Sequence, residues 1–276
     1  EYMQKNDAFL YDTHVHSTFS HDGKSTFDEY ATAMAEKRVK GIGFTEHLDF
    51  APEAAGYGRF KYEMYKKALN EYRDMGYEFY AGIELGYFAC AEEETLAGIR
   101  DKQFDYIIGA VHRVDGQSMS TKRFRDFIES GGDYISKIEH YYQSVSRSIR
   151  FRPFDVIAHI GVYKGFLTEE NRNSNRLVTL VEEMENEVAS ECAASGKIVE
   201  VNTSRLHSAL GETIPGRSFL ESYYKKGGRL ISIASDAHSA MCLARGFETA
   251  AALLENIGYK YITLPWDREH PVRIGE

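Results

Sequence analysis

The feature that most constrains the fold is an alternation, along the whole chain, of short apolar runs with longer helix-like segments. Eight apolar runs predict β-strands, at residues 8–13, 41–45, 78–83, 106–111, 156–159, 197–202, 229–234 and 259–263. Strands that alternate with helices form βαβ units around a parallel sheet. A length of 276 residues suits an α/β barrel, which typically has about 250 residues in one unit. We therefore expect one α/β barrel domain over residues 1–276.

Local signals predict where several helices begin and end. Ser25 and Thr26 offer hydroxyl caps before an Ala-rich segment that continues to Arg38. Residues 177–194 carry apolar side chains at helical spacing and stop before Gly196. The helix-like run 122–150 is interrupted by two consecutive glycines at 131 and 132, so we expect two helices there.

Metal-binding residue types follow the predicted strands. His14 and His16 end the first strand, and a spacing of two residues places both imidazoles on one face. Such a pair alone is often only two polar positions on a half-exposed strand. Here, however, other strand ends also carry ligand types: His21, His47, Glu84, His112, His159, Asp236 and His238. Neutral imidazole with carboxylate suits zinc, iron or manganese. We expect a metal centre at one end of the barrel.

Three further histidines have no such placement, and we expect them to be structural or on the surface: His140, His207 and His270.

The ordered set of motifs resembles the polymerase and histidinol phosphatase family of metal-dependent phosphoesterases, most of all its histidinol-phosphate phosphatase branch. The motifs are Asp12-Thr13-His14-Val15-His16 with His21 behind it, Phe44-Thr45-Glu46-His47, Gly82-Ile83-Glu84, Gly109-Ala110-Val111-His112, Ala158-His159, Glu200-Val201-Asn202 and Ser235-Asp236-Ala237-His238. They extend over nearly the whole chain.

The resemblance implies a distorted (β/α)7 barrel with two to three divalent ions, Zn, Fe or Mn, at the carboxyl ends of its strands. The first ion would be held by His14, His16, Glu84 and Asp236. Glu84 would bridge to a second ion, held also by His112 and His159. A third ion would be held by His21, His47 and His238.

Such ions can lower the pKa of a shared water and stabilise charge on phosphate oxygens, which the slow hydrolysis of phosphate monoesters requires. We therefore expect a hydroxide held between the first two ions to attack phosphorus in line. Glu84 would bridge these ions, and Asp236 or His238 would handle the proton that the leaving alkoxide receives. The expected reaction is hydrolysis of L-histidinol phosphate to L-histidinol and phosphate, in histidine biosynthesis. Another small phosphorylated metabolite, a nucleotide or phosphotyrosine is the alternative substrate.

Recognition of the substrate phosphate is where the sequence departs from the family. The family's phosphatases generally place Arg near the phosphate, because a guanidinium matches two phosphate oxygens. The Asp often found two residues after the fifth-strand His is Gly161 here. The candidates for phosphate binding are Arg205, Lys164 and Arg113.

Composition limits the partners. A formal net charge of −9 argues against a sequence-independent nucleic-acid surface, which would need clustered Lys and Arg. No apolar run approaches the roughly 20 residues of a membrane span, and residues 1–6 lack the apolar core of a signal peptide. The three dispersed cysteines predict buried free thiols in a reducing compartment. We expect a cytoplasmic enzyme for a small phosphomonoester, without a nucleic-acid or membrane partner; its oligomeric state stays open.

Two other classes of function remain open. The fold occurs as a proofreading or accessory domain beside polymerases, which the lack of a second domain and of a basic face disfavours. A non-catalytic metal-binding protein is also conceivable, although all nine ligand positions carry a suitable residue.

Overall fold

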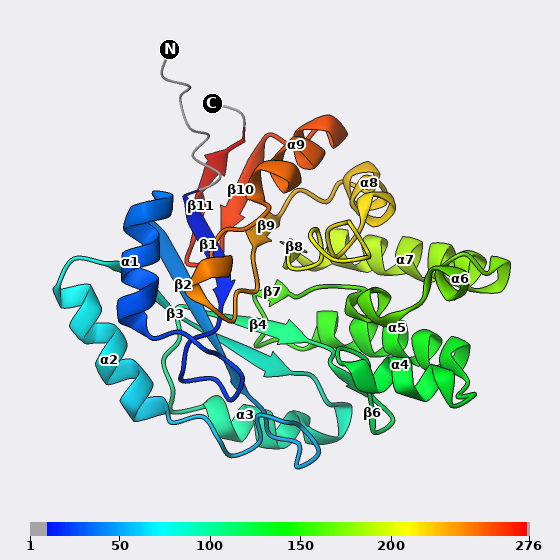
Figure 1. Ribbon diagram of the computed structural model, residues 1–276, viewed down its shortest axis with the longest axis horizontal. Helices are drawn as coiled ribbons and strands as arrows, with labels where there is room; N and C mark the ends of the chain where they lie inside the picture. Colours follow the sequence, from blue (N-terminus) through cyan, green and yellow to red (C-terminus); the bar gives the residue numbers. More distant parts are fainter. Residues whose placement is uncertain (1–9, 275–276) are drawn as a thin grey trace.

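The computed structural model describes residues 10–274, and its centre is a sheet of seven parallel strands (Figure 1). In spatial order these are β1 (Tyr11–Val15), β2 (Gly41–Leu48), β3 (Glu78–Gly86), β4 (Tyr106–Ala110), β7 (Val156–Ile157), β8 (Ile198–Asn202) and β9 (Ile231–Ala234). The first and last strands lie next to each other: Val15 forms a parallel bridge with Ala237, and the His16 N–H donates to the Ala237 carbonyl over 2.8 Å. The sheet thus closes almost completely, and the predicted distorted (β/α)7 barrel is confirmed.

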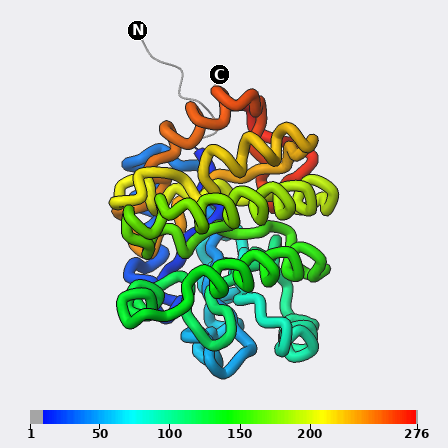
Figure 2. Tube along the Cα trace, turned by 90° about the vertical axis from the view of Figure 1, so that its right-hand side faces the viewer, coloured from blue at the N-terminus to red at the C-terminus, as the bar shows by residue number. Residues whose placement is uncertain are grey.

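Helices surround this barrel. They are α1 (Phe27–Lys37), α2 (Tyr62–Asp74), α3 (Glu92–Ile99), α4 (Lys122–Glu129), α5 (Tyr134–Arg150), α6 (Glu169–Arg172), α7 (Asn175–Ser195), α8 (Arg217–Lys225) and α9 (Phe247–Ile257), with the short 3-10 helices η2 (Ala89–Ala91), η3 (Val162–Phe166) and η4 (Ala240–Cys242). Figure 2 shows α5, α7 and α8 side by side on one flank, where neighbouring helices contact each other. Within residues 10–274, no helix has the length and apolar character needed to traverse a membrane.

The predicted helix ends agree with the structure because capping residues determine them. Thr26 caps α1 by accepting from the Glu29 N–H, while the Glu29 carboxylate accepts from the Thr26 N–H. Gly196 ends α7 in the left-handed region, at φ 71°. The two glycines at 131 and 132 do separate α4 from α5.

The last predicted strand is placed differently from the others. Residues 261–264 form β10 (Tyr261–Leu264), but this strand pairs antiparallel with β11 (Asp267–Arg273) and is not part of the barrel. The expectation that it joins the parallel sheet is therefore wrong, because the chain reverses directly at Pro265 and Trp266 and supplies its own partner strand. A second small hairpin consists of β5 (Arg113–Val114) and β6 (Gln117–Ser118). Residues 8 and 9 of the first predicted strand lie outside the described residues.

The barrel interior is filled by a small apolar cluster, whose buried members are Tyr106, Ile108, Ala110, Val156, Ala158 and Ile198. The Tyr106 hydroxyl reaches across to donate to the Thr13 carbonyl over 2.6 Å. Gly43 and Gly82 leave room for this ring: a Cβ at Gly43 would lie 1.8 Å from the Tyr106 hydroxyl, and one at Gly82 would lie 2.7 Å from its Cζ. Both positions thus require glycine.

All three cysteines are free thiols, as predicted. Cys192 is buried and Cys242 is partly buried, but Cys90 is exposed. The expectation of burial is therefore wrong for Cys90, which lies in the short η2 turn on the surface rather than in a packed helix.

Candidate metal centre

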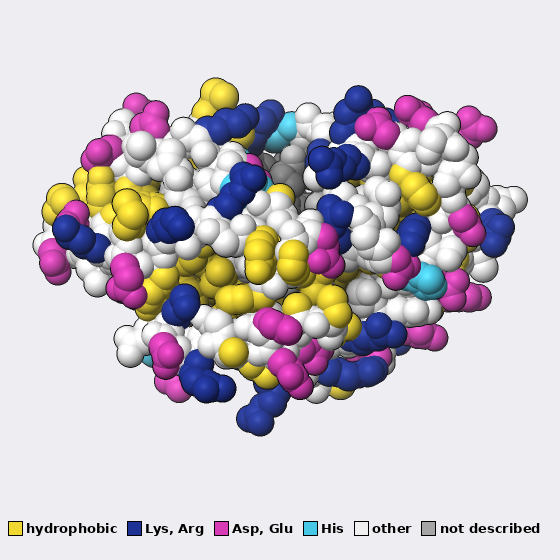
Figure 3. Space-filling view, turned by 90° about the horizontal axis from the view of Figure 1, so that it is seen from below, with side chains coloured by type: hydrophobic (Ala, Val, Ile, Leu, Met, Phe, Trp, Pro, Cys, Tyr) yellow, Lys and Arg dark blue, Asp and Glu magenta, His cyan; other side chains and the backbone are white. Residues whose placement is uncertain are grey.

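The nine side chains predicted to bind metal leave the carboxyl ends of six barrel strands, or the loops that follow them. They are His14, His16 and His21 from β1 and its loop, His47 from β2, Glu84 from β3, His112 after β4, His159 after β7, and Asp236 and His238 after β9. Since the strands are parallel, these ends lie at one end of the barrel. Figure 3 views the side at which β1 and β2 end: this face is hollowed near its middle, with Lys and Arg side chains around the hollow.

Glu84 is the centre of this cluster, with a side chain that is only 1% exposed. Its Oε2 atom lies 3.1 to 3.4 Å from imidazole nitrogens of His14, His16 and His47. Its Oε1 atom lies 3.2 Å from His112 Nε2 and 3.0 Å from His159 Nε2. One buried carboxylate therefore faces five imidazoles: three lie near its Oε2 atom and two near its Oε1 atom.

The donor atoms are close enough to share ions. Within residues 10–274, three groups each have ligand atoms within 4.8 Å of one another: His14, His16 and Asp236; His47, Glu84 and His112; and His16, Asp22, His47 and His238. Two atoms that bind one zinc ion at about 2.0–2.3 Å each lie at most about 4.6 Å apart. The donor types and spacing thus fit divalent metal ions, in agreement with the predicted metal dependence.

Hydrogen bonds to the ring nitrogen that faces away from the cluster orient two of the imidazoles. His14 Nδ1 lies 2.6 Å from Glu200 Oε2, and His16 Nδ1 lies 3.1 Å from the Ser20 hydroxyl. Metal-binding histidines commonly hold their second nitrogen in this way. The Nε2 atoms of both rings therefore point to the cluster, where they lie 3.0 Å apart.

The imidazoles differ in their electrostatics. Burial is outweighed by Glu84 and other carboxylates, which raise the pKa of His14 well above its usual value and that of His47 to about 9. Burial and the neighbouring His238 and His47 lower the pKa of His16 to about 3, so its imidazole is neutral. Burial alone would raise the pKa of Glu84, but the imidazoles of His47 and His14 outweigh it and hold that pKa well below its usual range. A neutral imidazole beside an ionised carboxylate is the form in which both residues bind a cation.

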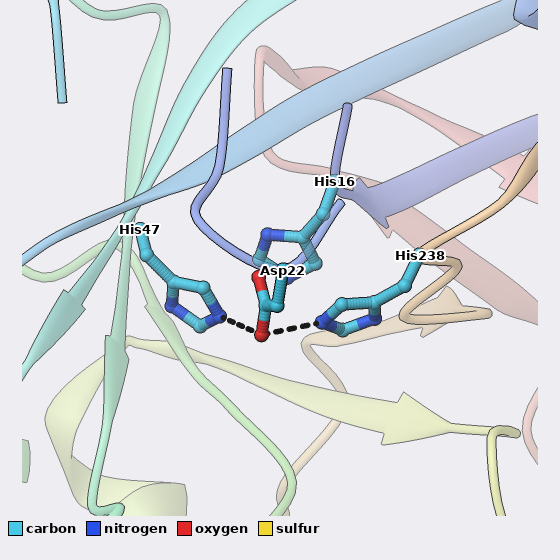
Figure 4. Close-up of side chains that lie close together, drawn as sticks. All are labelled: His16, Asp22, His47 and His238. Atoms are coloured by element: carbon cyan, nitrogen blue, oxygen red, sulfur yellow. Dashed lines mark ion pairs between the residues drawn. The ribbon is translucent and has the colours of Figure 1, made fainter. Parts of the chain in front are cut away.

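The third group contains a residue to which the sequence assigned no role, Asp22. Its Oδ2 atom lies 3.6 Å from His47 Nε2 and 3.3 Å from His238 Nε2 (Figure 4). His21 Nε2 lies 3.7 Å from the same oxygen, but His21 is not a member of the three compact groups. The sequence signal for Asp22 was its place directly after His21 in the same polar run.

Two further carboxylates support the site without joining those groups. Glu200 contacts His14 and also accepts from the His159 N–H over 3.1 Å. Glu46 is fully buried and accepts from the Ser17 backbone N–H and hydroxyl, the latter over 2.6 Å. Both lie within motifs recognised in the sequence, yet residue type alone could not separate a ligand from the partner of a ligand.

A pocket of about 590 Å³ opens over the cluster. Seven of the nine predicted ligands line it, together with Asp22, Arg113, Arg205, Lys122 and Arg123. The Arg205 guanidinium lies 4.6 Å over the ring of Phe166. Lys164 is not among the lining residues; its Nζ lies 2.6 Å from Glu185 Oε1. Two of the three cations predicted for phosphate binding therefore face the pocket.

The three remaining histidines lie outside this cluster. His140 pairs with Asp115 over 2.7 Å, His270 pairs with Asp267 over 2.8 Å, and His207 is exposed.

The sequence and the fold are similar to those of known proteins. A family model described as "PHP domain" matches residues 12–204. A probable histidinol-phosphatase of Clostridium acetobutylicum is 27% identical over 257 residues, which cover 91% of this chain and 95% of that protein. The histidinol-phosphatase of Lactococcus lactis is 24% identical and covers 90% and 91%. The crystal structure of a histidinol phosphate phosphatase from Lactococcus lactis, in complex with zinc, L-histidinol and phosphate, superposes with a TM-score of 0.76 at 18% identity, covering 95% of this chain and 99% of that one.

Proposed function

We propose that this chain, which belongs to the PHP domain family, hydrolyses L-histidinol phosphate to L-histidinol and phosphate in a metal-dependent reaction. The observation that carries the proposal is the buried Glu84 carboxylate among five imidazoles, on a barrel that matches histidinol-phosphatases over nine-tenths of its length.

Two to three divalent ions, Zn, Fe or Mn, complete the site. His14, His16, Glu84 and Asp236 would hold the first ion, and Glu84, His112 and His159 the second. When bound, such ions lower the pKa of water and offset charge on the phosphoryl oxygens.

For a third ion, His47 and His238 need a further ligand, and Asp22 or His21 can supply it. Asp22 has the better geometry, because its carboxylate lies between both imidazoles. Asp22→Asn and His21→Asn, each assayed for bound metal, separate the two. We expect the Asp22 variant to lose up to one equivalent and the His21 variant to keep it; the reverse result would restore His21 as the ligand.

Cationic side chains position the substrate phosphate. Arg205 and Arg113 line the pocket, and a guanidinium can donate to two phosphate oxygens at once. Arg205 is the stronger candidate, since its stacking on Phe166 orients the guanidinium. Lys164 remains the third candidate, and it would first have to leave Glu185.

Asp236 or His238 would take the proton that the attacking water releases and pass it to the leaving alkoxide. His238 Nδ1 lies 3.0 Å from the Asp236 carbonyl, and Asn202 donates to Asp236 Oδ2 over 3.2 Å. Asp236→Asn with bound metal measured tests this role: full metal content with full activity would exclude Asp236 from the proton path.

The test of the function itself is steady-state kinetics of the metal-reconstituted protein on L-histidinol phosphate, nucleotides, phosphotyrosine and sugar phosphates. We expect a kcat/KM for L-histidinol phosphate several decades above the others. A higher value for another phosphomonoester would make that compound the substrate. A metal-replete protein inactive on all of them would favour a non-catalytic role.

A further inference from the structure

Like Asp236, His159 is a proposed ligand whose backbone is in the left-handed region, at φ 27°. Non-glycine residues rarely adopt such angles, and they persist only where the surroundings enforce them. The ring Nε2 lies 3.0 Å from Glu84 Oε1 and 3.3 Å from His112 Nε2. The backbone angle thus directs the imidazole toward Glu84 and His112.

The ring of His159 lacks the hydrogen bond that orients the rings of His14 and His16. Its Nδ1 atom is buried and has no hydrogen-bond partner within residues 10–274. By contrast, Nδ1 of His14 contacts Glu200 and Nδ1 of His16 contacts Ser20. The orientation of the His159 ring therefore depends on its backbone.

Three contacts fix that backbone. The His159 N–H donates to Glu200 Oε1 over 3.1 Å, and its carbonyl accepts from the Val162 N–H over 2.9 Å. The third contact is the hydroxyl of Tyr141, which donates to the same carbonyl over 3.4 Å and accepts from the Gly161 N–H over 2.9 Å. One phenol thus joins the residue before and the residue after the turn at Ile160.

Tyr141 is itself held rigidly on α5. Its side chain is fully buried, and its ring packs edge-on against Tyr142 and Tyr163, with interplanar angles of 82° and 73°. Gly161, at φ 96°, lets the chain bring its N–H to the hydroxyl. No carboxylate or metal ligand side chain is hydrogen-bonded to this phenol in the described part of the chain.

We propose that Tyr141 is a positioning residue: its hydroxyl clamps the turn after β7 so that His159 faces the metal site shared with Glu84 and His112. The inference rests on the metal-dependent function proposed above.

The test is Tyr141→Phe in the whole 276-residue chain, with zinc affinity measured by competition with a chromogenic chelator. The substitution keeps the ring packing and removes only the hydroxyl. We expect one zinc equivalent to bind about tenfold more weakly, because changes to residues that orient metal ligands typically weaken binding by that much. Accordingly, kcat should fall at limiting zinc and recover at saturating zinc. Gly161→Ala, which strains the same turn without a steric clash, should weaken the same equivalent.

Tyr142→Phe is the matched control. This neighbour is equally buried on the same helix, but its hydroxyl contacts Tyr163 and Glu185 instead of the ligand turn. We expect it to lower the melting temperature without changing zinc affinity. Unchanged zinc affinity in Tyr141→Phe, or an equal loss in both variants, would overturn the inference. If the wild-type protein neither binds zinc nor hydrolyses L-histidinol phosphate, the proposed function fails as well.

Discussion

The two ends of the barrel differ in the side chains that they contain. At the amino ends of the strands, Trp266 from the turn of the β10–β11 hairpin stacks on Tyr80 with ring centroids 3.9 Å apart and lies beside Tyr106 and Tyr11. At the carboxyl ends, the Glu84 carboxylate is buried among several imidazoles. The amino ends of the strands, called the closed end below, have aromatic contacts. The carboxyl ends, called the open end, have ionisable groups.

This difference implies that one end mainly stabilises the fold and the other mainly supports activity. Burying aromatic surface stabilises the fold at about 25 cal/mol per Å². Burying ionisable groups costs free energy unless partners or metal ions offset it. The comparison therefore predicts that changes at the closed end lower the free energy of unfolding, and that changes at the open end lower activity.

The largest effect should come from Glu84→Gln at the open end. The substitution keeps the volume of the side chain but removes the charge that faces five imidazoles. We expect kcat/KM to fall by about three decades or more, the loss of several kcal/mol of transition-state stabilisation by bound ions. The measurement is kinetics on the metal-reconstituted variant, with bound metal determined in parallel.

Circular dichroism is the control for this variant, since the barrel should keep its secondary structure. Wild-type activity with full metal content would show that Glu84 is not needed, and the two ends would not differ as described.

Trp266→Ala should have the next largest effect, and only on stability. The side chain is partly buried, so we expect a loss of about 2–3 kcal/mol of unfolding free energy, below the range for a fully buried Trp. Urea unfolding measures it, with kcat/KM determined at a temperature where the variant is folded. A marked loss of activity in the folded variant would mean that the closed end also shapes the site.

Glu200→Gln tests the support behind the ligands. The amide cannot accept from both His14 and the His159 backbone as the carboxylate does, so metal affinity and kcat/KM should fall about 10–100-fold. Asp155→Asn is the matched control at the other end of the sheet. Asp155 accepts from the Ile107 N–H over 2.8 Å just before β7, and its loss should leave kcat/KM unchanged. Equal losses in both variants would point to a general effect of removing a carboxylate that accepts hydrogen bonds from the backbone.

The sequence predicted the architecture well because its local signals are strong. The capping residues Thr26 and Gly196 and the glycines at 131 and 132 act within a few residues of themselves, and the structure agrees with each. The predicted strand at 259–263 was wrongly grouped with the parallel strands, because its pairing with β11 depends on a chain reversal that apolar patterning does not encode.

At the site, residue type and strand ends identified which side chains meet, but not their contacts. Lys164 is a candidate phosphate ligand in the sequence, and only the structure shows that Glu185 on α7 pairs with its amine. Glu200 lies in a motif of the sequence and Asp22 directly follows His21, but only the distances to His14 and His238 show which side chain each one contacts. Long-range contacts of this kind have no local signature.

Tyr106→Phe should have the smallest effect. It tests where along the barrel a change stops affecting only stability and begins to affect activity. Its hydroxyl donates to the Thr13 carbonyl, one residue before His14. Removing one buried hydrogen bond should cost about 1–2 kcal/mol of unfolding free energy, measured by urea unfolding. The ring still fills the space left by Gly43 and Gly82, so β1 should keep its position and kcat/KM should stay within twofold of the wild type. A larger loss of activity would mean that the position of His14 depends on this hydrogen bond in the barrel interior. The part of the barrel that affects activity would then extend to the amino side of Thr13.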